Sequence, residues 1–261
     1  MKRAILLLSL SLALVSVQGF VLQSVRIVNG TTSAPGQFPY QVMVIASIPF
    51  GQALCGGTLI SDQWIVTAGH CIDGAYAFEV HLGAQKFNDY TEPGREIYFS
   101  FDSILHERYT ASIAANDIGL IKLPNKVNFT KNIQPASLPT SQDLLVGKTV
   151  IASGWGLQST SASRPASELQ YAPLQVLSNE ECAKSYDPVL IRPSIICAKG
   201  ANLQSPCSGD SGGPLVLNGT RTLVGITSFG SVLGCDFGYP GGFSRVAYFL
   251  DWISAKTGIK V

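Results

Sequence analysis

The sequence predicts an all-β protein of two packed barrels with one helix at the C-terminal end. Short runs rich in Val, Ile, Leu and Phe recur between clusters of Gly, Pro, Asn and Ser, which is typical of strands joined by turns. Hydrophobic residues make up 46% of the 261 residues and charged residues only 13%. This balance supports a sizeable core and excludes a disordered or coiled-coil protein.

The predicted strands fall into two groups, one in each half of the chain. The first group comprises Gln41 to Ile48, Thr58 to Thr67, Phe78 to Leu82 and Ile118 to Leu123. The second comprises Thr149 to Ser153, Glu168 to Leu177, Pro214 to Leu217, Thr222 to Ser228 and Gly242 to Val246. Between them, residues 128–147 are rich in Pro, Asn and Ser, so we place the connection between the barrels there. The barrels are expected at about residues 27–135 and 145–246.

The predicted helix covers about residues 247–256. Its apolar residues Val246, Phe249, Leu250 and Ile253 recur at helical spacing, and Gly258 follows as a stop signal. Such a stripe could bind a partner protein, but a terminal helix more commonly packs on its own barrel. We therefore expect packing against the barrel.

The N-terminus resembles a secretory signal peptide over residues 1–19. Lys2 and Arg3 precede an apolar run from Ala4 to Val17, and small or compact residues follow at the usual cleavage spacing. The alternative is a membrane anchor, but this run is too short to span about 30 Å of hydrocarbon. We expect a secreted, extracellular protein, with the gut lumen as one candidate site.

A short segment, residues 20–26, precedes a predicted processing bond. It ends in Arg26 and is followed at once by Ile27-Val28-Asn29-Gly30. Removing residues 1–26 takes away three basic residues and no acidic one, so the remaining chain is slightly negative. No basic patch is left to attract nucleic acid or an anionic membrane, and neither partner is expected.

Six cysteines form an even set, which in a secreted chain favours disulfides over free thiols. They are Cys55, Cys71, Cys182, Cys197, Cys207 and Cys235. Three N-x-S/T sequons, at Asn29, Asn128 and Asn218, are candidate glycosylation sites. Neither His81 nor His106 lies in a metal-binding motif, so no metal or other cofactor is expected.

Three separated segments together carry the parts of a nucleophilic centre: Thr67-Ala68-Gly69-His70-Cys71, Asn116-Asp117-Ile118-Gly119-Leu120 and Gly209-Asp210-Ser211-Gly212-Gly213-Pro214. A serine hydroxyl is a weak nucleophile unless a neighbouring base takes its proton, and imidazole titrates close enough to neutral pH to do so. A carboxylate on the far side of the ring holds the required tautomer. The candidate roles are Ser211 as nucleophile, His70 as base and Asp117 as orienting acid.

With these motifs, the chain resembles the chymotrypsin-like serine peptidases over essentially all of residues 27–261. Ile27-Val28-Asn29-Gly30 and Ser153-Gly154-Trp155-Gly156 add to the resemblance. The resemblance implies two packed six-stranded antiparallel Greek-key barrels and the triad His70, Asp117 and Ser211. Invertebrate digestive chymotrypsins and collagenolytic relatives look most similar.

The resemblance also implies how the centre is built and switched on. Backbone N–H groups of Gly209 and Ser211 would form the oxyanion hole. The carboxylate of Asp210 would pair with the ammonium group of Ile27 after a trypsin-like protease cuts behind Arg26. The implied disulfides are Cys55 with Cys71, Cys182 with Cys197, and Cys207 with Cys235.

The implied specificity pocket carries no charge. Its residues are Ser205 at the base, Ser228, Phe229 and Gly230 in the walls, and Gly241 near the far side. Such a pocket suits large apolar or aromatic side chains. Asp236 could turn toward the pocket and admit basic residues, but it directly follows Cys235 and is expected to face solvent.

The sequence therefore predicts a secreted, monomeric digestive endopeptidase made as a zymogen. Its expected partners are protein substrates, a trypsin-like activating protease and protein inhibitors. Elastase-like or collagenolytic specificity is the alternative within the enzyme class. A non-catalytic binding protein on the same scaffold is the alternative outside it, and the intact triad argues against that alternative.

Overall fold

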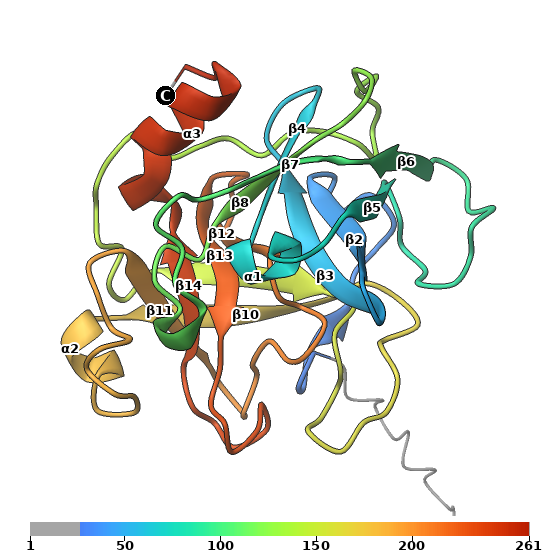
Figure 1. Cartoon of the computed structure of the whole chain (residues 1–261). Helices are drawn as coiled ribbons and strands as arrows, with labels where there is room; N and C mark the ends of the chain where they lie inside the picture. The colour runs from blue at the N-terminus through green and yellow to red at the C-terminus, as the bar shows by residue number, and fades with distance from the viewer. Residues whose placement is uncertain (1–26, 261) are drawn as a thin grey trace, which may run out of the picture.

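The computed structural model describes residues 27–260, so the predicted signal peptide and propeptide lie outside the described residues. Two antiparallel sheets of seven strands each form the body of the molecule, with a helix at the C-terminal end (Figure 1). The predicted fold class, two packed antiparallel barrels and a terminal helix, is confirmed. No helix within residues 27–260 is long and apolar enough to cross a bilayer.

The first barrel has the strand order β6-β5-β2-β3-β4-β8-β7. The strands are β2 (Gln41–Ile48), β3 (Gly51–Leu59), β4 (Trp64–Thr67), β5 (Ala77–Leu82), β6 (Glu96–Ser100), β7 (Asp102–Leu105) and β8 (Gly119–Lys122). Its two edge strands, β6 and β7, are consecutive in the chain and separated by Phe101 alone. They act as one bent strand that pairs with β5 on one side and β8 on the other, which reconciles seven segments with six predicted strands.

The second barrel has the strand order β1-β10-β11-β14-β13-β12-β9, and pairing of β10 with β9 closes it. The strands are β1 (Thr31–Thr32), β9 (Thr149–Gly154), β10 (Gln170–Leu177), β11 (Ile195–Gly200), β12 (Pro214–Leu217), β13 (Leu223–Phe229) and β14 (Gly241–Arg245). Strand β10 shows the alternation of a strand with one buried face, with Ala172, Leu174 and Val176 pointing into the core.

Each end of the described chain crosses to the other barrel. Strand β1 pairs with β10, and Ile27 is fully buried in the core of the second barrel. The first barrel was expected to begin at about residue 27. It begins later in the chain, because the side chain of Ile27 is buried in the second barrel. At the other end, Phe249 and Ile253 pack into the core cluster that contains the first barrel's strands.

The C-terminal helix begins with a 3₁₀ turn. The turn η2 (Val246–Phe249) leads into α3 (Leu250–Thr257), and Gly258 ends the helix in the left-handed conformation at φ 75°. The packing agrees with the expectation from the apolar stripe. Three further short helices had no clear periodic signal: α1 (Gly69–Ile72), η1 (Ala111–Ile113) and α2 (Asn179–Cys182).

The contact between α3 and the first barrel should weaken in acid. The buried ring of His106 lies 5.6 Å from the ring of Phe249 and 5.0 Å from that of Trp252, and its Nδ1 accepts the N–H of Arg108 at 3.1 Å. Burial lowers the pKa of His106 below 6.5. The unfolded chain therefore takes up a proton that the folded chain resists, and the free energy of unfolding falls as pH drops below about 6.5.

We predict that the variant His106→Asn, in a Ser211→Ala background that prevents self-cleavage, loses less stability than the parent between pH 7.5 and 5.0. Asparagine can still accept the Arg108 N–H but does not titrate. Urea unfolding at both pH values measures the difference. An equal loss of stability in the two proteins would show that His106 is not the acid-sensitive group.

Candidate active site

His70 and Asp117 form a doubly bonded pair. The Nδ1 atom of His70 lies 2.8 Å from Oδ2 of Asp117, and the His70 backbone N–H donates to Oδ1 at 2.9 Å. His70 is on α1, directly after β4, and Asp117 directly precedes Ile118 and β8. A carboxylate facing Nδ1 keeps the proton on that nitrogen, which leaves Nε2 as the proton acceptor.

The carboxyl group of Asp117 is buried and receives a third donor from the second barrel. The hydroxyl of Ser228, on β13, donates to Oδ2 at 2.6 Å. The hydroxyl of Ser244, on β14, donates to the Asp117 backbone carbonyl at 2.6 Å. From the sequence, Ser228 was predicted only as part of the pocket wall, and Ser244 was not predicted as a site residue. No local pattern marks either one, because its partner is more than 100 residues away in the chain.

Ser211 lies in a tight turn that two left-handed glycines make possible. Gly209 has φ 95° and Gly212 φ 77°, a region that residues with a Cβ rarely adopt. The Ser211 carbonyl accepts the N–H of Gly56 from β3 at 2.7 Å, which ties the turn to the first barrel. The loop is therefore held by both barrels.

Two amides in this turn remain available to a ligand. The N–H groups of Asp210, Gly212 and Gly213 donate to backbone carbonyls. Among the hydrogen bonds of residues 27–260, the N–H groups of Gly209 and Ser211 have no acceptor. These are the two amides expected to face a developing oxyanion.

A cavity of about 340 Å³ opens beside Ser211. All five residues predicted for the specificity pocket line it, together with Ser211: Ser205, Ser228, Phe229, Gly230 and Gly241. None of the lining residues in the described part of the chain has a charged side chain. The cavity can therefore take a large apolar side chain, and it offers no counter-ion to a basic one.

Asp210 is fully buried, directly before Ser211. Its Oδ1 accepts the N–H of Gly156 at 2.8 Å, and its Oδ2 accepts the N–H of Cys207 at 2.9 Å. Despite these two donors, burial raises the pKa of Asp210 to about 6. The ionised carboxylate is therefore short of positive charge at neutral pH.

The residues that follow the predicted processing bond are packed near the base of the cavity. Val28 forms a backbone bridge with Ser205, and the side chain of Asn29 donates to the Asn202 carbonyl at 2.6 Å. The Gln204 side chain in turn donates to the Asn29 carbonyl at 3.0 Å. The position of residues 27–29 is thus linked to the loop that carries Ser205.

Three disulfides connect the cysteines in the pairs that the resemblance implies. Cys55–Cys71 joins β3 to the helix of His70, Cys182–Cys197 joins α2 to β11, and Cys207–Cys235 joins the Ser211 segment to the loop after β13. The described residues contain one cluster of potential metal ligands, Cys55, His70 and Cys71. Both of its sulfurs are in a disulfide, so they cannot bind a metal as thiolates.

The three sequons differ in their surroundings. Asn128 and Asn218 are exposed, whereas Asn29 is half-buried and its amide nitrogen is engaged with Asn202.

Comparison with known proteins gives consistent similarities over most of the chain. The family model described as Trypsin matches residues 27–253. Brachyurin from Leptuca pugilator is 40% identical over 89% of this chain and 99% of its own length. Collagenase from Hypoderma lineatum is 38% identical over 92% of this chain and 90% of its own length. The crystal structure of HL collagenase matches with a TM-score of 0.83 at 37% identity, covering 90% of this chain and all of that chain.

The paired oxygens of Asp117 lead to a prediction about the reactivity of Ser211. In Asp117→Asn an amide NH₂ replaces one acceptor, so His70 Nδ1 loses the partner that keeps its proton in place. We predict that sulfonylation of Ser211 by a sulfonyl fluoride, in chain cleaved after Arg26, slows by about 10⁴-fold. Peptide mass spectrometry follows the label. The exposed-carboxylate variant Asp251→Asn serves as control, and an unchanged rate in Asp117→Asn would remove Asp117 from the centre.

Proposed function

Because the chain belongs to the trypsin family of serine endopeptidases, we propose that it is a secreted endopeptidase that cleaves protein chains after large apolar or aromatic residues. The observation that carries the proposal is the His70–Asp117 pair, whose carboxylate is bonded to Ser228 in the wall of an uncharged cavity that Ser211 also lines. A digestive role is part of the proposal, because the segment expected to be removed on activation, residues 20–26, is short.

In the proposed mechanism, His70 transfers a proton from the Ser211 hydroxyl to the leaving amine. The Ser211 hydroxyl attacks the scissile carbonyl while Nε2 of His70 takes its proton, and the acyl group becomes bonded to Oγ. His70 then returns that proton to the leaving amine. In the second half-reaction, His70 takes a proton from water, which attacks the acyl ester, and then returns the proton to Oγ of Ser211 as the carboxylic acid product leaves. Asp117 keeps Nδ1 protonated throughout and stabilises the imidazolium ion that forms.

The proposed oxyanion hole consists of the free N–H groups of Gly209 and Ser211. In the tetrahedral intermediate the carbonyl oxygen carries a full negative charge, so donors fixed in advance stabilise it more than the substrate. Removing one such donor costs roughly 3 kcal/mol in comparable enzymes. The hydrogen bond from Gly56 to the Ser211 carbonyl supports this geometry from the first barrel.

The proposed switch is the pairing of Asp210 with a charge that proteolysis creates. Cleavage after Arg26 would create an ammonium group on the backbone nitrogen of Ile27. The side chain of Ile27 is already buried, so the new charge would lie at the edge of the core. The buried Asp210 carboxylate is short of positive charge, and pairing would compensate the burial of both groups. Val28 and Asn29 would transmit the insertion to the Ser205 loop through the contacts described above.

The second candidate is collagenolytic activity. It is favoured by the likeness to proteins named brachyurin and collagenase. The residues that line the cavity indicate which side chain is accepted before the cut. They do not indicate whether triple-helical collagen is a substrate. Incubation of the activated enzyme with native triple-helical collagen below its melting temperature distinguishes the two.

The uncharged cavity predicts side-chain preference. On matched peptides that differ only in the residue before the cut, kcat/KM should be higher for Phe, Tyr and Leu than for Arg or Lys by at least about 100-fold. A buried ammonium or guanidinium group would lack a partner in the cavity, at a cost of several kcal/mol. Preference for Arg or Lys would contradict this specificity and leave the nucleophilic centre untouched.

Activation is tested separately. Trypsin treatment should raise the activity of the purified precursor, and the uncleavable variant Arg26→Gln should stay inactive. Asp210→Asn should be cut at the same bond yet gain at least about 100-fold less activity, because the new ammonium group has no anionic partner. Asp102→Asn, which changes an exposed carboxylate on β7, is the matched control. Full activity of uncut Arg26→Gln would refute the switch.

A further inference from the structure

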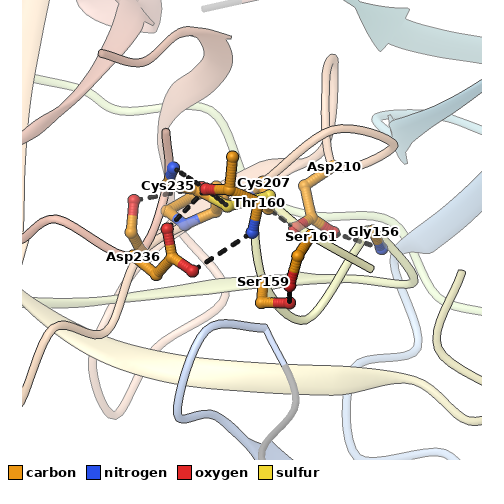
Figure 2. The surroundings of a disulfide bond; sticks show 10 residues. Gly156, Ser159, Thr160, Ser161, Cys207, Asp210, Cys235 and Asp236 are labelled. Atoms are coloured by element: carbon orange, nitrogen blue, oxygen red, sulfur yellow. Dashed lines mark hydrogen bonds between the residues drawn. A yellow bond between two sulfur atoms is a disulfide. The ribbon is translucent and has the colours of Figure 1, made fainter. Parts of the chain in front are cut away.

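Two loops that line the cavity are joined by one side-chain pair, Thr160 and Asp236 (Figure 2). Thr160 lies in the loop between β9 and β10, and Asp236 lies in the loop between β13 and β14. The Thr160 hydroxyl donates to Oδ1 of Asp236, and the Thr160 backbone N–H donates to Oδ2 at 3.2 Å. Both oxygens of the carboxylate are therefore occupied by a single residue.

The same hydroxyl has a second partner, which fixes its orientation. Its oxygen accepts the backbone N–H of Cys235 at 3.1 Å. Gly234 packs against Thr160 so closely that a Cβ there would lie 3.0 Å from Cγ2 of the threonine. We call the group of Thr160, Gly234, Cys235 and Asp236 the clasp.

The clasp lies in the wall of the proposed specificity pocket. Thr160, Gly234 and Cys235 all line the cavity, whereas Asp236 does not. The disulfide Cys207–Cys235 connects the clasp to the segment of Ser211. The Leu157 N–H donates to the Ser208 carbonyl at 2.8 Å, which ties the other loop to the same segment.

Asp236 was expected to face solvent and not the pocket. Its side chain does not line the cavity, and it is partly exposed and turned toward Thr160. The hydroxyl of Thr160, more than any other group, lowers the pKa of Asp236, so the side chain is ionised at neutral pH. A negative charge is thus held one residue from the lining of a cavity that has no charged lining residue.

We propose that Thr160 is a specificity-determining residue that holds the carboxylate of Asp236 out of the cavity and keeps the cavity selective for uncharged side chains. The proposal rests on the proposed function, because it assumes that this cavity takes the residue before the cut. Losing the hydroxyl would free one oxygen of Asp236 and the N–H of Cys235 together. The released carboxylate could then approach a basic side chain at the cavity rim.

The test uses Thr160→Val, which removes the hydroxyl at nearly constant shape. The ratio of kcat/KM for an Arg substrate to that for the matched Phe substrate should rise about fivefold, as expected of one partly exposed ion pair. The change should lie mainly in KM, because the nucleophilic centre is intact. Thr160→Ser should keep the parent ratio, since it retains the hydroxyl. Active-site titration corrects every variant for its competent fraction.

The double variant Thr160→Val with Asp236→Ala identifies the source of the gain. The ratio should return to within twofold of the parent value, because no carboxylate remains to be released. Ser161→Ala, which removes a hydroxyl that contacts Ser159 in the same loop, should leave the ratio unchanged.

Two results would overturn the proposal: an unchanged ratio in Thr160→Val, or a gain that persists in the double variant. The parent enzyme's own preference tests the proposed function, whereas the change between parent and variant tests the clasp. Failure of one is therefore distinguishable from failure of the other.

Discussion

The buried carboxylate of Asp117 is the interaction on which the arrangement of the centre depends. It accepts three hydrogen bonds, two from His70 of the first barrel and one from Ser228 of the second. A buried ionised carboxylate with fewer partners would be costly, so these donors have to converge. Their convergence fixes the two barrels relative to each other at the point where the cavity opens.

A second buried carboxylate, Asp210, has a different balance of partners. Among residues 27–260 it accepts two backbone donors, and burial raises its pKa to about 6. The hydrogen-bond donors around Asp117 compensate the burial of its carboxylate. Those around Asp210 do not, so an added positive charge would stabilise its ionised form. The crossing of the N-terminal segment to the second barrel places Ile27 in the core where that charge would be made.

The strands that could be predicted from the sequence are those that local signals mark. Strand β2 was predicted with its observed bounds, and β12 likewise, because local apolar runs bounded by turn residues mark them. The segment from Thr58 to Thr67 was predicted as one strand, but a turn with Ser61 as a hydrogen-bond acceptor divides it into β3 and β4. Strand β11 and the β6–β7 strand were missed. Turn residues do mark both ends of β11, with Pro193-Ser194 before it and Gly200 at its end, whereas no turn residue directly follows β7.

The three residues of the candidate centre could be predicted from the sequence because each lies in a motif. The residues that surround them and hold them in place could not be predicted. His70, Asp117 and Ser211 each have a recognisable local context, and the cavity is lined by the residues expected from the resemblance. Ser244 and Thr160 act through partners 127 and 76 residues away. Only the folded chain brings such pairs together, so no spacing rule could have named them.

The most direct test of the account is the location of a covalent intermediate. The activated enzyme is mixed with a slowly hydrolysed ester of an aromatic acyl group, quenched in acid within milliseconds and digested for mass spectrometry. If Ser211 is the nucleophile, alcohol is released in a burst equal to the enzyme concentration, and one acyl adduct forms, on Oγ of Ser211. Turnover without a burst, or an adduct on any other residue, would contradict it.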